Sequence, residues 1–117
     1  MNNRTEYIFS YDTKLEALER SFYQCEHCGG YESKKNRFEA HHLVAIFFAR
    51  ETNIPHALIK SLENCTILCK QCHSHVHLQE NRQQYAQIAW YIFGIDVKYN
   101  ESKDDWRKDP NHPINRK

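Results

Sequence analysis

Residues 64–77 read NCTILCKQCHSHVH, and most of what the sequence says about the fold starts from this segment. Its short apolar run, Thr66 to Leu68, has the composition of a β-strand. The pair Cys69 and Cys72 follows at once, and a helical pattern continues beyond it. Two cysteines separated by two residues are the usual ligands of a zinc knuckle. The segment therefore predicts a strand and a helix joined at a metal site.

A second cysteine pair lies far upstream in the chain. Cys25 and Cys28 have the same two-residue gap, which lets both sulfurs point at one ion, so the two pairs together suit a tetrahedral zinc site. Residues 29–68 separate the pairs, more than the roughly 15–20 residues of a zinc ribbon, which predicts a substantial element between them. A redox dithiol is the alternative for either pair alone. The fifth cysteine, Cys65, is expected to be a small buried residue.

The length and composition predict one small intracellular domain. The chain has 117 residues, and its 16 Lys and Arg against 15 Asp and Glu give a net charge of +1, which points to no particular partner. With five Cys, eight His, three Gly and three Pro, the composition excludes a collagen-like or disordered chain. No signal peptide or membrane helix is visible, so we expect a cytoplasmic protein without a membrane partner. Residues 1–99 would form the domain and residues 100–117 a polar C-terminal tail.

Outside the quoted segment the pattern is that of an α+β fold. Asp12 or Thr13 can cap a helix over about residues 13–23. Three apolar side chains would share one face of this helix: Leu15, Leu18 and Phe22. Residues 38–44 alternate enough to predict a strand.

The region between the two predicted strands and the region after them are assigned to helices. Residues 43–63 form a connection in which Pro55 suits the first position of a helix reaching Leu62. A longer helical pattern covers about residues 70–93, and Gly94 suits its end.

Four histidines stand at spacings that suit metal chemistry. His41 and His42 are adjacent on a predicted strand, so their side chains point to opposite faces and cannot both bind one ion. One can be a ligand while the other acts as a base. His73 and His77 are spaced i, i+4 and share one helix face. Three imidazoles on one divalent metal leave positions open for water and substrate, as in a catalytic site.

The other histidines carry weaker signals. His75 projects to a different side of the predicted helix, where it either touches phosphate or faces solvent. His27, His56 and His112 have no such context and are expected to be ordinary surface or packed residues.

Taken together, these residues resemble the HNH endonuclease family of ββα-metal nucleases, in the subgroup with a four-cysteine structural zinc. The match covers residues 25–77, and its parts are Cys25-x2-Cys28, then Glu39-Ala40-His41-His42-Leu43-Val44, then Asn64-x4-Cys69-Lys70-Gln71-Cys72-His73-x3-His77. The resemblance implies a small ββα, treble-clef-like core with flanking helices, stapled by a zinc ion on the four cysteines. The stretch between the dyad and Asn64 looks longer than in compact members.

The resemblance also implies residue roles. His41, His73 and His77 would hold a catalytic divalent metal, which could be Mg²⁺, Mn²⁺, Ni²⁺ or Zn²⁺. His42 would be the general base that activates water, and Asn64 would brace the loop and orient His42. The implied reaction is phosphodiester hydrolysis that leaves 5′-phosphate and 3′-hydroxyl ends.

The implied partner is DNA in double-stranded form, met by local positive charge. The candidate contacts are Lys34, Lys35, Arg37, Lys70 and Arg82, with Arg107, Lys108, Arg116 and Lys117 in the tail. Trp90, Tyr91 and Phe93 would serve the core or a homodimer contact. Small HNH proteins of this kind are common in bacteria and phages. Two alternatives stay open: a catalytically silent, zinc-stapled nucleic-acid-binding module, and a redox or zinc-storage protein.

Overall fold

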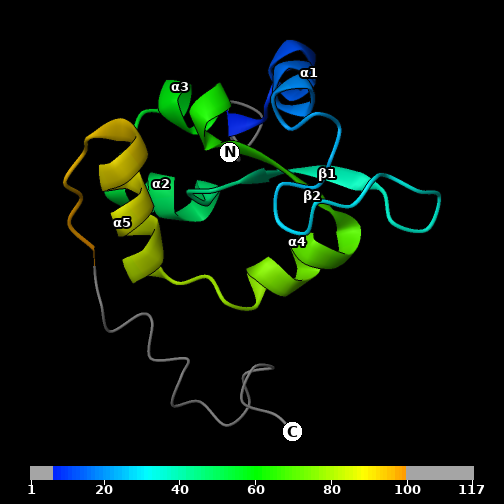
Figure 1. Ribbon diagram of the computed structural model, residues 1–117. Coiled ribbons are helices and arrows are strands. Elements are labelled where there is room, and N and C mark those ends of the chain that lie inside the picture. The colour runs from blue at the N-terminus through cyan, green and yellow to red at the C-terminus, as the bar shows by residue number, and fades with distance from the viewer. Residues whose placement is uncertain (1–6, 100–117) are drawn as a thin grey trace, which may run out of the picture.

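A computed structural model describes residues 7–99, which form a small α+β fold with five α-helices and one antiparallel two-stranded hairpin (Figure 1). The elements run in this order: α1 (Tyr11–Arg20), β1 (Phe38–His42), α2 (Ile46–Thr52), α3 (His56–Ile59), the 3₁₀ helix η2 (Leu62–Asn64), β2 (Cys65–Cys69), α4 (Lys70–His77) and α5 (Arg82–Phe93). The predicted tail over residues 100–117 lies outside the described residues. Within residues 7–99, no helix is long and apolar enough to cross a membrane.

The hairpin is the centre of the fold. Strands β1 and β2 pair over their full length, with Phe38 opposite Cys69 and His42 opposite Cys65. Since side chains alternate across a strand, Ala40 and Ile67 share the face that packs with Ala17 of α1. Helix α4 follows β2 without a loop, and Figure 1 shows α1 above the strands and α4 below them. The hairpin thus lies between two helices.

The first helix differs from its prediction at both ends. Ser10, rather than Asp12 or Thr13, is the N-cap, and its hydroxyl accepts a hydrogen bond from the Thr13 N–H at 3.1 Å. The helix ends at Arg20, and Phe22 follows with a φ of 57° and an 80% exposed side chain. The predicted apolar face was therefore wrong at Phe22, because the chain leaves the helix before that residue.

The predicted long helix over residues 70–93 was also wrong as one element. The chain leaves helix α4 after His77, and the Asn81 side chain caps α5 by accepting a hydrogen bond from the Gln84 N–H at 2.9 Å. Glu80 is one of the residues between the two helices. Gly94 ends α5 with a φ of 69°, as predicted.

The predicted connection holds more structure than one helix from Pro55. Helix α2 was missed entirely, and Pro55 stands just before the short helix α3. Helices α2, α3 and α5 bury a common apolar cluster, made of Val44, Ile46, Phe48, Ala49, Ile54, Ile59, Tyr85 and Ala89. The nearly continuous apolar run at α2 gave no helical period, which is why the sequence did not reveal it.

Candidate metal centres

The two cysteine pairs come together at one end of the hairpin. Cys25 and Cys28 lie in the turn before β1, whereas Cys69 ends β2 and Cys72 lies in the first turn of α4. The four sulfurs lie within 4.8 Å of one another, and Cys28 Sγ and Cys69 Sγ are 3.9 Å apart. Four thiols this close could hold a zinc ion.

Backbone N–H groups point at the sulfurs of this cluster. The N–H groups of Cys69 and Cys28 lie 3.3 and 3.5 Å from Cys25 Sγ. The Cys72 N–H lies 3.5 Å from Cys69 Sγ. Gly29 makes the turn that allows this, since its φ is 78° and its N–H bonds the Cys25 carbonyl at 2.8 Å. Such donors stabilise thiolates, the form of cysteine that binds metal.

The pKa values of the cysteines reflect this crowding. Burial by itself raises the pKa of Cys25, but N–H donors from Cys28, Cys69 and His27 outweigh it and lower that pKa to about 6. The Cys69 pKa is lowered in the same way against the effect of burial. Burial raises the pKa of Cys72, and the neighbouring sulfurs raise it further. A bound dication would relieve this crowding of thiolates.

Cys65 lies outside the cluster, as the sequence predicted. Its side chain is fully buried on β2, in the apolar cluster that includes Phe9 and Ala17. Burial raises its pKa to about 11, although Arg20 opposes that effect.

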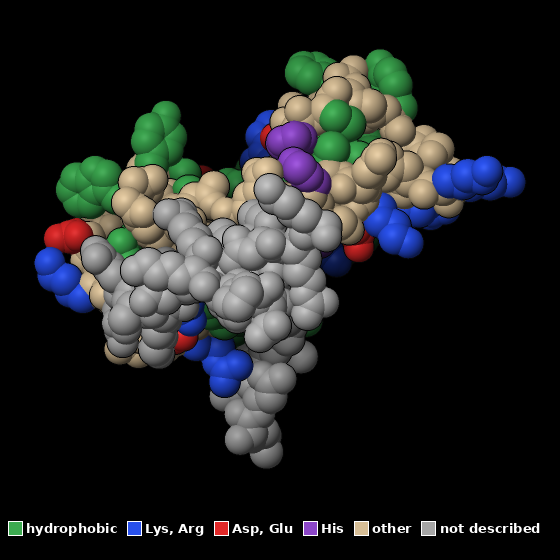
Figure 2. All heavy atoms as spheres, turned by 90° about the horizontal axis from the view of Figure 1, so that it is seen from below, with side chains coloured by type: hydrophobic (Ala, Val, Ile, Leu, Met, Phe, Trp, Pro, Cys, Tyr) green, Lys and Arg blue, Asp and Glu red, His purple; other side chains and the backbone are tan. Residues whose placement is uncertain are grey.

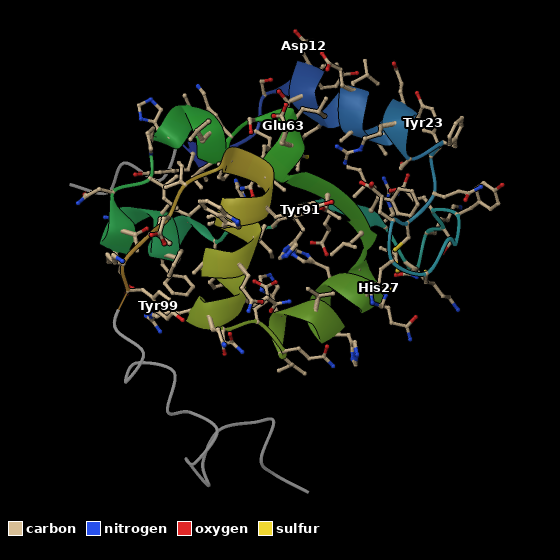
Figure 3. The ribbon with its side chains drawn as sticks, turned by 60° about the vertical axis from the view of Figure 1, so that its left-hand side comes forward. Asp12, Tyr23, His27, Glu63, Tyr91 and Tyr99 are labelled. Carbon is tan, nitrogen blue, oxygen red and sulfur yellow. The ribbon has the colours of Figure 1, made fainter. Side chains whose placement is uncertain are left out.

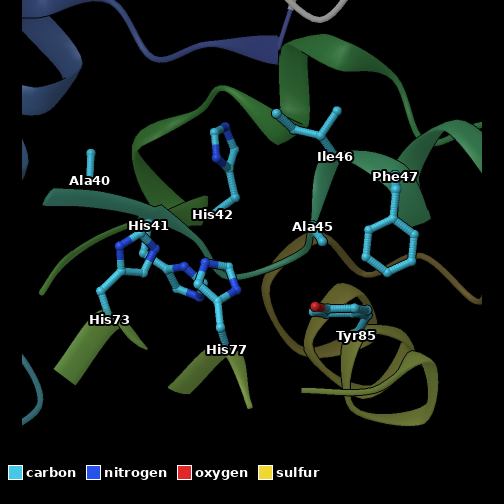
Figure 4. Close-up of a pocket in the computed structure, with 9 residues that line it drawn as sticks. All are labelled: Ala40, His41, His42, Ala45, Ile46, Phe47, His73, His77 and Tyr85. Atoms are coloured by element: carbon cyan, nitrogen blue, oxygen red, sulfur yellow. The ribbon is translucent and has the colours of Figure 1, made fainter. Parts of the chain in front are cut away.

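Three histidines form a second cluster beside the hairpin. His41 extends from β1, and His73 and His77 extend from successive turns of α4 (Figure 4). Their ligand nitrogens lie within 4.8 Å of one another, and the His41 ring centroid is 4.9 Å from that of His73 and 5.0 Å from that of His77. This group could hold a divalent metal. His75 is exposed, with Nε2 3.2 Å from Gln79 Nε2, and is not part of the group.

The sequence reasoning assigned no role to two carboxylates at this cluster. Glu39 Oε1 lies 3.1 Å from His73 Nδ1, so that nitrogen donates its proton and leaves Nε2 as the metal-binding atom. Glu80 Oε1 lies 2.7 Å from His41 Nε2. Glu39 could have been found from its place two residues before His41 on the same strand face. Glu80 could have been suspected from its place three residues after His77.

The His77 imidazole favours its neutral form. Burial lowers its pKa, the neighbouring histidines lower it further, and Glu80 opposes them. A neutral imidazole is the form that binds a metal. The His77 side chain is still 57% exposed, so the cluster opens toward solvent.

His42 lies on the other face of β1 from His41, as the strand prediction requires (Figure 4). Its ring stacks on Phe9 with centroids 4.0 Å apart, and its Nε2 lies 2.8 Å from the Tyr7 carbonyl oxygen. A carbonyl only accepts, so Nε2 carries the proton and donates, and Nδ1 is the basic nitrogen of the neutral ring. His42 and the three clustered histidines nevertheless line one open pocket of about 310 Å³.

Asn64 is fully buried and braces the chain just after His42. Its Oδ1 accepts from the Val44 N–H at 2.7 Å, and its Nδ2 donates to the carbonyls of Val44 and Ile59 at 3.2 and 2.8 Å. Its own carbonyl accepts from the Leu43 N–H at 3.0 Å. Within residues 7–99, its hydrogen bonds thus reach the loop that follows His42 and the end of α3, and not the imidazole.

The predicted DNA-contacting residues differ in their surroundings. Lys34, Lys35 and Lys70 are exposed, whereas Arg37 pairs with Glu32 at 3.4 Å. The remaining residue of the set, Arg82, makes a two-point ion pair with Glu51 and lies over the Phe47 ring at the pocket. In Figure 2, histidine side chains reach the surface of the lower face, and Lys and Arg side chains extend at its edges.

No family model, curated protein or solved structure matches this chain. The two clusters and the pocket therefore have to be interpreted from their own geometry.

Proposed function

We propose that this protein is a metal-dependent DNA endonuclease of the HNH kind, which hydrolyses phosphodiester bonds. The observation that carries the proposal is one pocket shared by His42 and by the cluster of His41, His73 and His77. A metal-binding cluster and a separately oriented basic histidine are the two parts that metal-assisted hydrolysis needs.

The three clustered histidines would hold the divalent cation. Their nitrogens already converge, and Glu39 fixes the His73 ring so that its Nε2 can face the cluster. When bound, Mg²⁺, Mn²⁺, Ni²⁺ or Zn²⁺ supplies positive charge that offsets the charge growing on the phosphate and on the leaving 3′ oxygen. The opening of the cluster on the pocket, with His77 half exposed, leaves a phosphate room to approach.

His42 would activate the attacking water. The Tyr7 carbonyl and the Phe9 ring fix the imidazole, so Nδ1 is the atom that takes the proton from water. The hydroxide oxygen then forms a bond to phosphorus while the bond from phosphorus to the 3′ oxygen breaks. The leaving 3′ oxygen takes a proton from solvent, and the imidazolium returns its own proton to solvent. The products are a 5′-phosphate and a 3′-hydroxyl. General-base help of this kind contributes about 10²–10⁴-fold to a rate.

The cysteine cluster would carry a structural zinc in the same protein. It ties the turn that holds Cys25 to the start of α4, and α4 carries two of the metal-binding histidines. The exposed Lys34, Lys35 and Lys70 would contact DNA phosphates near this end of the hairpin.

The test is cleavage of supercoiled plasmid DNA with a panel of divalent metals. Wild-type protein should nick or linearise the plasmid. His42→Ala should slow cleavage about 10²–10⁴-fold, with zinc content and fold unchanged. His27→Ala is the matched control, because His27 is an exposed histidine outside the pocket, and it should cleave like the wild type.

Two outcomes would contradict the proposal in different ways. Cleavage by His42→Ala at the wild-type rate would show that another group is the base. A protein that binds DNA but does not cleave it, whichever metal is added, would instead be the silent zinc-stapled binding module.

A further inference from the structure

A buried carboxylate stands at the histidine cluster without a role in the proposal above. Glu80 lies between α4 and α5, and its side chain is only 6% exposed. One oxygen, Oε2, accepts a hydrogen bond from the Tyr85 hydroxyl. The other, Oε1, lies 2.7 Å from His41 Nε2 and 3.8 Å from His77 Nδ1. A carboxylate is rarely buried unless its oxygens are paired or bind a metal.

The oxygen of Glu80 that faces the histidines, Oε1, is the inner oxygen, and no hydrogen bond within residues 7–99 pairs it. Glu80 Oε1 is buried and has no hydrogen-bond partner within the described part of the chain. It approaches His41 Nε2 closely, yet this contact does not have the geometry of a hydrogen bond. Two electron-rich atoms approach in this way when both face one cation. Ligands about 2.1 Å from an ion stand roughly 3.0–3.4 Å apart, so the two observed distances fall on either side of that spacing.

We propose that Glu80 Oε1 is a fourth protein ligand at the histidine cluster, which makes the cluster selective for six-coordinate cations such as Mn²⁺. This role for Glu80 rests on the proposed function only in that the cluster holds a divalent cation. Tyr85 is then a positioning residue, because its hydroxyl fixes the outer oxygen and leaves the inner one for the ion.

A fourth ligand changes which metals allow catalysis. Zinc sites with four protein ligands are closed, whereas octahedral ions keep two positions open for water and phosphate. Carboxylate oxygen also suits Mn²⁺ and Mg²⁺ better than imidazole alone does. Glu80 thus favours Mn²⁺ or Mg²⁺ as the activating metal, and Zn²⁺ at this cluster inhibits.

The fold explains why the carboxylate is held so firmly. Tyr85 is buried on α5, and its ring packs against Phe47 and Phe48 of α2. The break between α4 and α5 lets Glu80 reach back to the histidines while its partner stays in the core. In a continuous helix over these residues, the backbone position of Glu80 would be fixed relative to that of His77, three residues before it.

The experiment is a titration with Mn²⁺, followed by the loss of the free-ion electron paramagnetic resonance signal. The protein is loaded with one equivalent of zinc, which the thiolates take up, so that the histidine cluster is left for Mn²⁺. Glu80→Gln should weaken Mn²⁺ binding by about tenfold to a hundredfold, and Tyr85→Phe by a smaller factor. Glu63→Gln is the matched control, because Glu63 is an exposed glutamate on η2 (Figure 3).

The glutamine variant also separates a ligand from a residue that merely orients His41. A glutamine carbonyl would still accept a proton from the imidazole, so an orienting role would leave Mn²⁺ affinity nearly unchanged. It ligates Mn²⁺ far less well than a carboxylate does. Unchanged affinity in Glu80→Gln, or no Mn²⁺ binding by the wild type, would overturn the inference. If Glu80→Gln fails to fold, Glu80→Asp, whose shorter side chain draws the oxygen back, must show the same loss.

The nuclease proposal and the Glu80 proposal fail separately. Mn²⁺ binding that depends on Glu80, without cleavage of any DNA, supports the ligand and contradicts the nuclease. Cleavage that requires His42, with equal Mn²⁺ affinity in wild type and Glu80→Gln, does the reverse. When both hold, added Zn²⁺ should inhibit Mn²⁺-dependent cleavage by the wild type more than cleavage by Glu80→Gln.

Discussion

The cysteine cluster and the histidine cluster use the same hairpin and the same helix α4, yet they are built differently. The cysteine sulfurs are oriented by backbone N–H groups, and Cys25 and Cys69 are buried. In the histidine cluster the Glu39 carboxylate orients His73, and His77 opens on a pocket. Closed zinc sites serve structure and open ones chemistry, so under the proposed function the cysteine cluster would serve the first purpose and the histidine cluster the second.

The shared helix makes the two clusters unequal. Cys72 and His73 are neighbours on α4, so any ion that fixes Cys72 also fixes the helix that carries His73 and His77. The reverse does not hold, because removal of an imidazole leaves the sulfurs and their N–H donors in place. We therefore expect that loss of the cysteine cluster disrupts the histidine cluster, and that loss of the histidine cluster leaves the cysteine cluster intact.

The largest effect should come from Cys69→Ser. Cys69 is buried, pairs with β1 and is the N-cap of α4, so its loss should release zinc and prevent folding. Structural zinc binding contributes apparent free energies of about 10–16 kcal/mol, more than a small domain can spare. Zinc content and far-ultraviolet circular dichroism measure the outcome.

The control for that variant is Cys65→Ala, on the same strand. Cys65 is as buried as Cys69 but lies outside the cluster, so the variant should keep its zinc and lose only about 1 kcal/mol of packing. A Cys69→Ser protein that melts like the wild type with a full zinc content would contradict the structural role of the cluster.

The next effect should be confined to the histidine cluster. His73→Ala should abolish Mn²⁺ binding, since it removes one of the three nitrogens and the contact with Glu39. The free energy of unfolding should change by about 1 kcal/mol, as expected for a polar side chain that is 20% exposed and lies outside the apolar clusters. His75→Ala, on the same helix but outside the cluster, should bind Mn²⁺ like the wild type. Loss of zinc from His73→Ala would show that the clusters depend on each other in both directions.

The sequence predicted the two clusters better than it predicted the helices around them. Spacings such as Cys69 to Cys72 and His73 to His77 work over a single turn of chain, so local geometry alone brings each pair together. Joining the pairs needed the hairpin, whose strands were predicted over residues 38–44 and Thr66 to Leu68 and whose pairing the family resemblance implied. These are short-range features that a sequence records directly.

The missed features depend on distant partners. Glu80 reaches the histidines only because Asn81 starts a new helix there, and it is fixed by Tyr85 in a core shared with α2. Neither the helix start at Asn81 nor the contact with Tyr85 gives a periodic pattern in the sequence. The same holds for Ser10, a capping residue that could not be told from Asp12 or Thr13 by residue type.

A loss of stability, smaller than that of Cys69→Ser, is expected at the end of the hairpin opposite the cysteines. Asn64→Ala would leave the Val44 N–H and the carbonyls of Val44 and Ile59 without their partner, at a cost of about 3 kcal/mol. Glu63→Ala, one residue away and exposed, should cost less than about 0.5 kcal/mol. Urea denaturation gives both values. Equal stability of the two variants would remove Asn64 from the framework that supports His42.

The smallest effect concerns Cys65, the cysteine that lies outside the cysteine cluster. Cys25 and Cys65 are both buried, yet N–H donors lower the pKa of Cys25 to about 6, whereas burial raises that of Cys65 to about 11. An unfolded thiol ionises near pH 8.5, so the folded state disfavours the Cys65 thiolate. Its contribution to stability is complete below that pH and is lost as the pH rises toward 11.

Between about pH 8 and about pH 10 the wild type should therefore lose about 2 kcal/mol more unfolding free energy than Cys65→Ala. Urea denaturation of both proteins at the two pH values measures the difference, and every other titrating group cancels in it. A parallel loss in both proteins would mean that Cys65 ionises as easily as in the unfolded chain. The difference in pKa between Cys25 and Cys65 would then come from the N–H donors of the cysteine cluster alone, because burial without such donors would not have raised the pKa of Cys65.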